Sequence, residues 1–253
     1  MTGQTALVTG GAQRIGRAIA LDLARHGWAV AVHYRRSRAA AEAVVTEIQK
    51  LGGRAAALVC DLAREADVVR LVPRAVEALG PLTCLVNNAS NFEMDKVDTA
   101  TRESWDRHIE INLRAPLVLS QAFALQLPEG VDGNIVNLLD QRVWKLTPYF
   151  LSYTVAKSGL WTLTRTLALA LAPRIRVNGI GPGPTLPSER QSAEQFRRQQ
   201  LAVPLKHGPT PEEIAATLRF IMATPSMTGQ MIALDGGEHL GWAQSSRGFV
   251  ASE

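Results

Sequence analysis

Short apolar segments alternate with longer amphipathic ones along the whole chain, without internal repeats. The apolar segments are rich in Val, Ile and Leu and show little apolar–polar alternation, as expected of strands that are covered on both faces. We predict strands at 5–8, 29–33, 55–59, 84–87, 134–138, 176–180 and 230–234.

The segments between these strands predict amphipathic helices. We place the helices at 14–26, 38–51, 64–79, 103–126, 152–171 and 211–222. The first three end at Gly27, Gly52 and Gly80, and glycine just past a helix supplies a left-handed cap residue at low steric cost. Strands separated by helices of this length pair in parallel through right-handed crossovers. The sequence therefore predicts a single α/β domain over 1–253, with a doubly wound, Rossmann-type sheet of mostly seven parallel strands that binds ligands at their carboxyl ends.

Composition and charge narrow the class of protein. With 253 residues, 46% of them apolar and 20% charged, the chain can form the core of one domain. The net charge is only +4 and the basic residues are scattered, so we expect no nucleic-acid partner, and no metal site is predicted. Cys60 and Cys84 lie in apolar segments and are expected to stay reduced, as in the cytosol. Without an apolar stretch of about 18 residues or a signal peptide, we expect a soluble cytoplasmic protein with no membrane partner.

The first predicted strand runs into a glycine-rich turn at 9–16, Thr-Gly-Gly-Ala-Gln-Arg-Ile-Gly, and a helix follows. Such a turn places free backbone N–H groups and the positive end of a helix against a pyrophosphate. Arg14 stands where a glycine is usual, so its guanidinium is expected near the phosphates or the substrate pocket; a solvated arginine is the alternative. The predicted cofactor contacts of this turn are Gly10, Arg14, Ile15 and Gly16.

The end of the second predicted strand indicates which dinucleotide binds. NAD-specific sites carry a carboxylate about 20 residues beyond the glycines. Here 33–37 reads His-Tyr-Arg-Arg-Ser, and the first carboxylate is Glu42. Arginines and a hydroxyl suit a 2′-phosphate through charge-assisted hydrogen bonds, so we predict NADP(H), with one of the two arginines expected only to solvate the next helix. The predicted contacts are Tyr34, Arg35, Arg36 and Ser37, with Asp61 and Leu62 at the adenine ring.

Tyr153 and Lys157 lie four residues apart in a predicted helix, so both face one side, about 6 Å apart along the axis. A cation so placed favours tyrosinate and lowers the phenol pKa from its usual value of about 10. A tyrosine that exchanges a proton near neutral pH suits a reduction, which needs a hydride on one atom and a proton on its neighbour. Many helices carry such a pair on their surface, so the pair alone decides little.

Other motifs give this pair a context. In order along the chain these are 9–16, Asp61, 87–89, Asn112, Tyr153 with Lys157, 178–183 and 235–237. In these motifs the chain resembles the short-chain dehydrogenase/reductase family over nearly its whole length. The resemblance implies that Tyr153 donates a proton, that Lys157 holds the nicotinamide ribose and lowers the pKa of Tyr153, and that Asn112 anchors a water of a proton relay. It further implies a homotetramer and cofactor contacts by Asn88, Ala89, Lys157, Pro182, Gly183 and Thr185.

Asp140 departs from most members of that family. They place a serine at or near thirteen residues before the tyrosine, where it donates a hydrogen bond to a substrate carbonyl. An acid there argues against a plain ketone reductase, and it suits a heterocycle whose ring nitrogens and amino group offer donors, or a substrate that needs an additional proton. The alternative is an aspartate that only caps a loop.

A narrower resemblance, to the pteridine reductases of this family, accounts for Asp140. That subgroup combines an arginine at the Arg14 position, a run like that at 33–37, and aspartate, tyrosine and lysine at this spacing. It also carries an aromatic residue after Asn-Ala-Ser, as Phe92 follows 88–90.

This narrower resemblance implies a substrate site. Phe92 and the nicotinamide would sandwich a flat pterin ring, while Ser90 and Arg14 would hydrogen-bond the ring and the cofactor phosphates. The alternative for Phe92 is packing under the loop at 93–98. The predicted substrate contacts are Arg14, Ser90, Phe92, Asp140 and Tyr153, and the predicted catalytic residues are Asn112, Asp140, Tyr153 and Lys157.

The leading prediction is an NADPH-dependent reductase of a small pterin-like substrate, such as a dihydropterin or dihydrofolate, that acts on a ring C=N bond. A carbonyl reductase acting on a 3-oxoacyl thioester or a sugar ketone is the second reading, and a non-catalytic NADP(H)-binding sensor is the third. The polar, irregular segment 184–206 is expected to form a substrate lid. The tail after Gly237, with Trp242 and Phe249, is a candidate for packing on a neighbouring subunit.

Overall fold

The structure, a computed structural model, describes residues 4–188 and 190–241. Its strands form one parallel sheet in the order β3-β2-β1-β4-β5-β6-β7. The strands are β1 Thr5–Val8, β2 Ala29–Tyr34, β3 Ala55–Val59, β4 Cys84–Asn87, β5 Gly133–Leu138, β6 Ile175–Pro182 and β7 Met231–Leu234. Because the order reverses between β1 and β4, a crevice opens at their carboxyl ends, as predicted for a doubly wound sheet.

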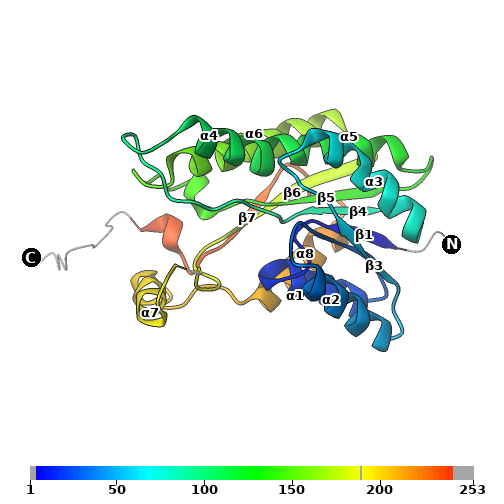
Figure 1. Cartoon of the computed structure of the whole chain (residues 1–253), viewed down its shortest axis with the longest axis horizontal. Helices are drawn as coiled ribbons and strands as arrows, with labels where there is room; N and C mark the ends of the chain where they lie inside the picture. The colour runs from blue at the N-terminus through cyan, green and yellow to red at the C-terminus, as the bar shows by residue number, and fades with distance from the viewer. Residues whose placement is uncertain (1–3, 189, 242–253) are drawn as a thin grey trace, which may run out of the picture.

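Helices cover both faces of the sheet. In Figure 1, α3, α4, α5 and α6 lie on one face and α1, α2 and α8 on the other, while α7 stands apart beyond β7. The α-helices are α1 Arg14–Arg25, α2 Arg38–Lys50, α3 Glu65–Leu79, α4 Arg102–Ile109, α5 Ala115–Gln126, α6 Leu151–Ala170, α7 Ala193–Ala202 and α8 Pro211–Ala223. Short helical turns are η1 Glu110–Arg114, η2 Gln141–Val143 and η3 Glu238–Leu240. None of the helices in the described part is long and apolar enough to cross a membrane.

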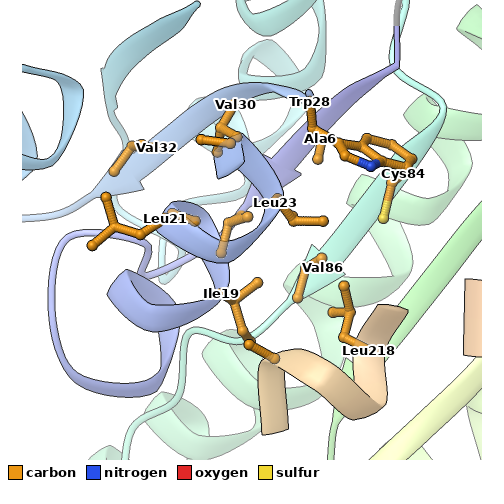
Figure 2. Close-up of a cluster of buried hydrophobic side chains, with 14 of the residues drawn as sticks. Ala6, Ile19, Leu21, Leu23, Trp28, Val30, Val32, Cys84, Val86 and Leu218 are labelled. Atoms are coloured by element: carbon orange, nitrogen blue, oxygen red, sulfur yellow. The ribbon is translucent and has the colours of Figure 1, made fainter. Parts of the chain in front are cut away.

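Alternation along β1 separates the two cores. Ala6 and Val8 pack in one cluster with Ile19 of α1 and Leu218 of α8, whereas Leu7 belongs to the cluster under α3 and α5. Figure 2 shows the first cluster, with Ile19 and Leu218 pointing toward the strands. Since successive side chains of a strand point to opposite faces, a strand that is covered twice is apolar throughout, which is the pattern seen in the sequence.

Two predicted segments differ from the structure. The single helix predicted at 103–126 is divided into α4, the π-helical turn η1 and α5. Pro116 stands in the first turn of α5, and because proline lacks an N–H group it cannot continue the α-helical bonding pattern of the preceding turn. The segment 184–206 is not irregular throughout, because it contains α7, which begins at a capping box between Ser192 and Gln195.

Candidate active site

A cleft of about 1100 Å³ opens at the carboxyl ends of the strands. It brings together the predicted site residues, with the exception of Asn112. These are Gly10, Arg14, Ile15, Gly16, Tyr34, Arg35, Arg36, Ser37, Asp61, Leu62, Asn88, Ala89, Ser90, Phe92, Asp140, Tyr153, Lys157, Pro182, Gly183 and Thr185. Residues far apart in the sequence therefore share one site, because parallel strands end at the same edge.

The glycine-rich turn between β1 and α1 has the form of an anion site. Gly10 has a φ of +63°, and a Cβ atom on Gly16 would lie 2.1 Å from the carbonyl oxygen of Gly10, so both positions need glycine. The residue before α1, Gln13, makes no side-chain cap, and the first turn carries no acidic residue. The N–H groups at this helix end consequently remain available for a phosphate.

Two residues that the sequence did not single out hold this turn in place. The Nδ1 atom of His33 accepts a hydrogen bond from the Gly10 N–H at 3.0 Å, and its Nε2–H donates to the carbonyl of Cys60 at 3.1 Å. Burial lowers the pKa of His33 to about 4, so the ring is neutral, as an acceptor must be. Thr9 Oγ1 accepts from the N–H groups of Asn88 and Ala89, at 2.9 and 3.0 Å. The turn is thus fixed to both β2 and β4.

The two arginines after β2 stand free at the cleft. Arg35 and Arg36 are exposed and line it, and neither guanidinium has an ion-pair or hydrogen-bond partner within 4–188 and 190–241. Arg38, in contrast, is paired with Glu42 at 2.7 Å. No carboxylate lies at the end of β2, where an NAD-specific site would have one. This edge of the cleft is arranged for an additional anionic group.

Tyr153, at the start of α6, is directly bonded to Asp140. The Tyr153 hydroxyl donates to Asp140 Oδ2 at 2.8 Å, and an Nη1–H of Arg142 donates to the same oxygen at 3.0 Å. Asp140 Oδ1 accepts from the Arg142 N–H at 2.8 Å and so caps η2. Asp140 therefore caps a turn, as in the alternative interpretation, and it also contacts the tyrosine; its predicted role toward the substrate stays a prediction.

The electrostatics of the Tyr153–Lys157 pair differ from the expectation. Burial, together with the Asp140 carboxylate, raises the pKa of Tyr153 well above 10. Burial also lowers the pKa of Lys157 to about 8, and its ammonium group donates to the carbonyl of Leu138 at 2.6 Å. The expected net lowering of the Tyr153 pKa is not found, because burial and the Asp140 carboxylate raise it more than the Arg142 guanidinium lowers it. Tyr153 is a proton-bearing group in this arrangement.

Asn112 lies behind the cleft, in the π-helical turn η1. Its Oδ1 atom accepts from the Asn91 N–H at 2.8 Å and from the Ser90 hydroxyl at 3.2 Å, and its Nδ2 atom donates to the Asn91 carbonyl at 2.9 Å. The side chain thus fixes the segment that leads into Phe92. Its predicted role in a water relay stays a prediction.

An aromatic group borders the cleft next to Tyr153. Phe92 stacks on Phe150 with ring centres 4.4 Å apart and meets the Tyr153 ring edge-on at 4.8 Å. The Arg142 guanidinium lies 5.5 Å from the centre of Phe92 and 5.2 Å from that of Phe150. The sequence did not point to Phe150 or Arg142, although Arg142 is only two residues from Asp140.

Arg14 connects the phosphate turn to the predicted lid. Its guanidinium donates to the carbonyls of Leu186 and Pro187, at 3.2 and 2.8 Å. It holds a φ of +54°, a region that glycine adopts far more readily. The lid also lines the cleft with three amide side chains, Gln191, Gln195 and Gln199. Trp242 and Phe249, which were expected to meet another subunit, lie outside the described residues.

Comparison with known proteins decides the family. The family model described as short chain dehydrogenase matches residues 4–198. The chain belongs to the short-chain dehydrogenase family. This short-chain dehydrogenase is 52% identical to FolM alternative dihydrofolate reductase 1 from Brucella suis, solved in complex with NADP; the TM-score is 0.93, over 97% of this chain and 99% of that one.

Two further relatives of this short-chain dehydrogenase carry the same name and a different one, respectively. The FolM alternative dihydrofolate reductase 1 of Brucella canis, complexed with NADP, is 51% identical with a TM-score of 0.93, over 97% of this chain and 98% of that one. A 3-oxoacyl-[acyl-carrier-protein] reductase of Synechocystis is 34% identical over 94% of this chain and 97% of its own length. The family thus includes relatives named for a heterocyclic substrate and relatives named for a carbonyl substrate.

Proposed function

We propose that this short-chain dehydrogenase is an NADPH-dependent reductase of a pterin-like heterocycle, a dihydropterin or dihydrofolate, at a ring C=N bond. The observation that carries the proposal is the 2.8 Å hydrogen bond between Tyr153 and Asp140, at a position where a carbonyl reductase of this family has a serine. The 52% identity to an alternative dihydrofolate reductase over nearly the whole chain supports the same substrate class.

The residues of the cleft fit NADP(H). The uncapped end of α1 and the glycines at 10 and 16 suit the pyrophosphate, and the unpaired Arg35 and Arg36 suit the 2′-phosphate. Lys157 and Thr185 line the part of the cleft assigned to the nicotinamide half. Both FolM relatives were solved with NADP, which supports this choice of cofactor.

Proton delivery is the work of this chain's own residues. NADPH, when bound, would supply the hydride for a ring carbon. Tyr153 then supplies the proton to the neighbouring ring nitrogen, since its raised pKa keeps the hydroxyl protonated until an acceptor arrives. The Asp140 carboxylate holds the hydroxyl in place at 2.8 Å and can accept hydrogen bonds from a substrate amino group, which a serine serves less well.

The substrate ring is held by shape as well as by charge. Phe92 is 39% exposed and lines the cleft beside Tyr153, so the part of its ring that Phe150 does not cover can contact a planar ring. Arg14 and Ser90 line the same cleft: Arg14 offers hydrogen-bond donors, and the Ser90 hydroxyl, whose proton is directed to Asn112, offers its oxygen as an acceptor. A 3-oxoacyl thioester is the second candidate substrate, favoured by the identity to 3-oxoacyl reductases.

Replacing Asp140 by Ser distinguishes the two substrate classes. A pterin reductase should lose about 100-fold in kcat/KM for dihydrobiopterin, because the carboxylate contact is lost, whereas NADPH binding should persist. A carbonyl reductase should keep or gain activity on a 3-oxoacyl thioester. An Asp140→Ser enzyme that reduces dihydropterins as well as the wild type does contradicts the proposal.

We also propose a soluble, cytoplasmic homotetramer whose partners are small molecules rather than nucleic acids or membranes. Cys60 and Cys84 are buried and unpaired, and burial raises the pKa of their thiols to about 11 and about 12, which suits a reducing compartment. Leu125 and Leu169, on α5 and α6, are 88% and 83% exposed, which supports subunit contacts on this face. Light scattering coupled to size-exclusion chromatography measures the subunit number; four subunits are expected, and any other number contradicts the homotetramer.

A further inference from the structure

A buried polar network lies beside the active site and has no part in the chemistry above. Asp95 is 3% exposed, and His108 and Ser152 are fully buried. Asp95 comes from the segment after Phe92, His108 from α4, and Ser152 from the first turn of α6, next to Tyr153. Buried ionisable side chains are costly unless each hydrogen-bonding group is satisfied. The network therefore needs an explanation.

The hydrogen bonds of this network determine which nitrogen of the His108 ring carries the proton. The Ser152 hydroxyl donates to the Asp95 carboxylate, and Ser152 Oγ lies 2.6 Å from Nδ1 of His108. A serine hydroxyl has one proton, so Ser152 Oγ must accept from His108 Nδ1–H. His108 Nε2 then accepts from the Glu93 N–H at 3.2 Å. His108 is thus a neutral Nδ1–H imidazole, in line with burial, which lowers its pKa.

Asp95 closes the amino end of α6. Phe150, the residue before the helix, has a φ of +59° and provides no side-chain cap. Asp95 Oδ1 instead accepts from the Ser152 N–H at 3.1 Å, and the Asp95 backbone carbonyl accepts from the Leu151 N–H at 3.3 Å. Burial opposes ionisation of Asp95, but hydrogen bonds from Ser152 and Ser104 outweigh it and hold its pKa below the usual value. A carboxylate at the positive end of a helix is stabilising.

We propose that Asp95 and His108 are positioning residues for the reduction, locking the first turn of α6, which carries Tyr153, to the segment 91–95, which carries Phe92. The rings of Phe92 and Tyr153 meet at 4.8 Å, and the His108 ring lies 6.0 Å from that of Tyr153. These hydrogen bonds keep the Tyr153 hydroxyl and the Phe92 ring at a fixed separation. This positioning role rests on the proposed function in that Tyr153 donates the proton and Phe92 contacts the substrate.

His108 makes two links, and two substitutions separate them. His108→Asn keeps a donor near the Nδ1 position for Ser152 but loses the acceptor for the Glu93 N–H. His108→Gln keeps an acceptor for that N–H but loses the donor toward Ser152. We expect His108→Gln to lower kcat about 10- to 100-fold with KM nearly unchanged, because Tyr153 is displaced. We expect His108→Asn to raise the substrate KM about 10-fold with a smaller change in kcat, because the Phe92 segment loosens.

Two substitutions of Asp95 remove its hydrogen bonds to α6 fully or in part. Asp95→Ala removes the cap of α6 and should lower kcat about 100-fold, whereas Asp95→Asn retains an acceptor for the Ser152 N–H and should recover part of that loss. The matched control is Thr210→Ala, which removes a comparable cap from α8 on the opposite face of the sheet. Thr210→Ala should lower the melting temperature and leave kcat and KM unchanged. NADPH affinity, measured by fluorescence titration, should be the same in all variants.

The kinetics are measured with the substrate that the wild type reduces fastest. If the two His108 variants change kcat and KM in the same proportion, or if Asp95→Asn is no better than Asp95→Ala, the network is only structural and the proposal is overturned. A wild type that reduces carbonyl substrates but no dihydropterin refutes the proposed function alone, since the His108 comparison can still be made. A wild type that reduces neither class overturns both.

Discussion

Stability at mildly acidic pH tests the role assigned to His33 beneath the phosphate turn. The ring is buried and neutral, with Nδ1 accepting from Gly10 and Nε2–H donating to Cys60. Its pKa is lowered from 6.5 to about 4, chiefly by burial. The unfolded chain therefore binds a proton near pH 6.5, while the folded chain resists it until about pH 4. The stabilisation is complete above pH 6.5 and is lost as the pH falls toward 4.

The magnitude follows from the two pKa values. Since one pKa unit corresponds to about 1.4 kcal/mol, the free energy of unfolding should fall by about 2 kcal/mol between pH 7 and pH 5. The loss should reach about 3 kcal/mol at pH 4. This is a large share of the stability of a domain, which is usually about 5–15 kcal/mol.

Urea unfolding of the wild type and of His33→Asn, at several pH values between 4 and 7, measures this loss. The asparagine can keep an acceptor for the Gly10 N–H but does not titrate, so the difference between the two proteins isolates His33. Other groups, including His108, titrate in both proteins and cancel. The variant should be less stable at pH 7 and should approach or overtake the wild type at pH 4. Parallel curves for the two proteins would refute a buried, neutral His33.

Three further predictions concern the cleft. Arg35→Ala and Arg36→Ala should together weaken NADPH binding about 10- to 150-fold and leave NADH binding nearly unchanged, as measured by fluorescence titration; an equal loss for both cofactors contradicts a 2′-phosphate contact. Tyr153→Phe should lower kcat by about 100-fold or more with NADPH affinity retained, and undiminished turnover in a stopped-flow assay rules out Tyr153 as proton donor. Gly16→Ala should abolish NADPH binding, because the added Cβ meets the Gly10 carbonyl at 2.1 Å; calorimetry showing normal affinity contradicts the geometry of the turn.

The fold could be predicted because its determinants are local. Apolar strands, amphipathic helices and terminal glycines such as Gly27 and Gly80 each signal an element within a few residues. The order of the elements then fixes the sheet topology through the rules for parallel crossovers. The position of the site could also be predicted, because 9–16 and Asp140 each come just after a strand, and parallel strands end at the same edge of the sheet.

Features that depend on long-range packing could not be predicted. His33 is linked to Gly10 and Cys60 only in the folded sheet. The pKa of Tyr153 depends on desolvation, which a helical spacing does not reveal.

The helix α7 was missed because its composition is polar, although its capping box was a local signal.

The relative rates with heterocyclic and carbonyl substrates determine the substrate class of the enzyme. The kcat/KM of the wild type with NADPH is compared for dihydrobiopterin, dihydromonapterin, dihydrofolate and a 3-oxoacyl thioester, by following NADPH oxidation. A site with a carboxylate at Asp140 should favour at least one of the heterocycles over the thioester by about 100-fold or more. Turnover of the thioester with none of the three heterocycles reduced would contradict a pterin-like substrate.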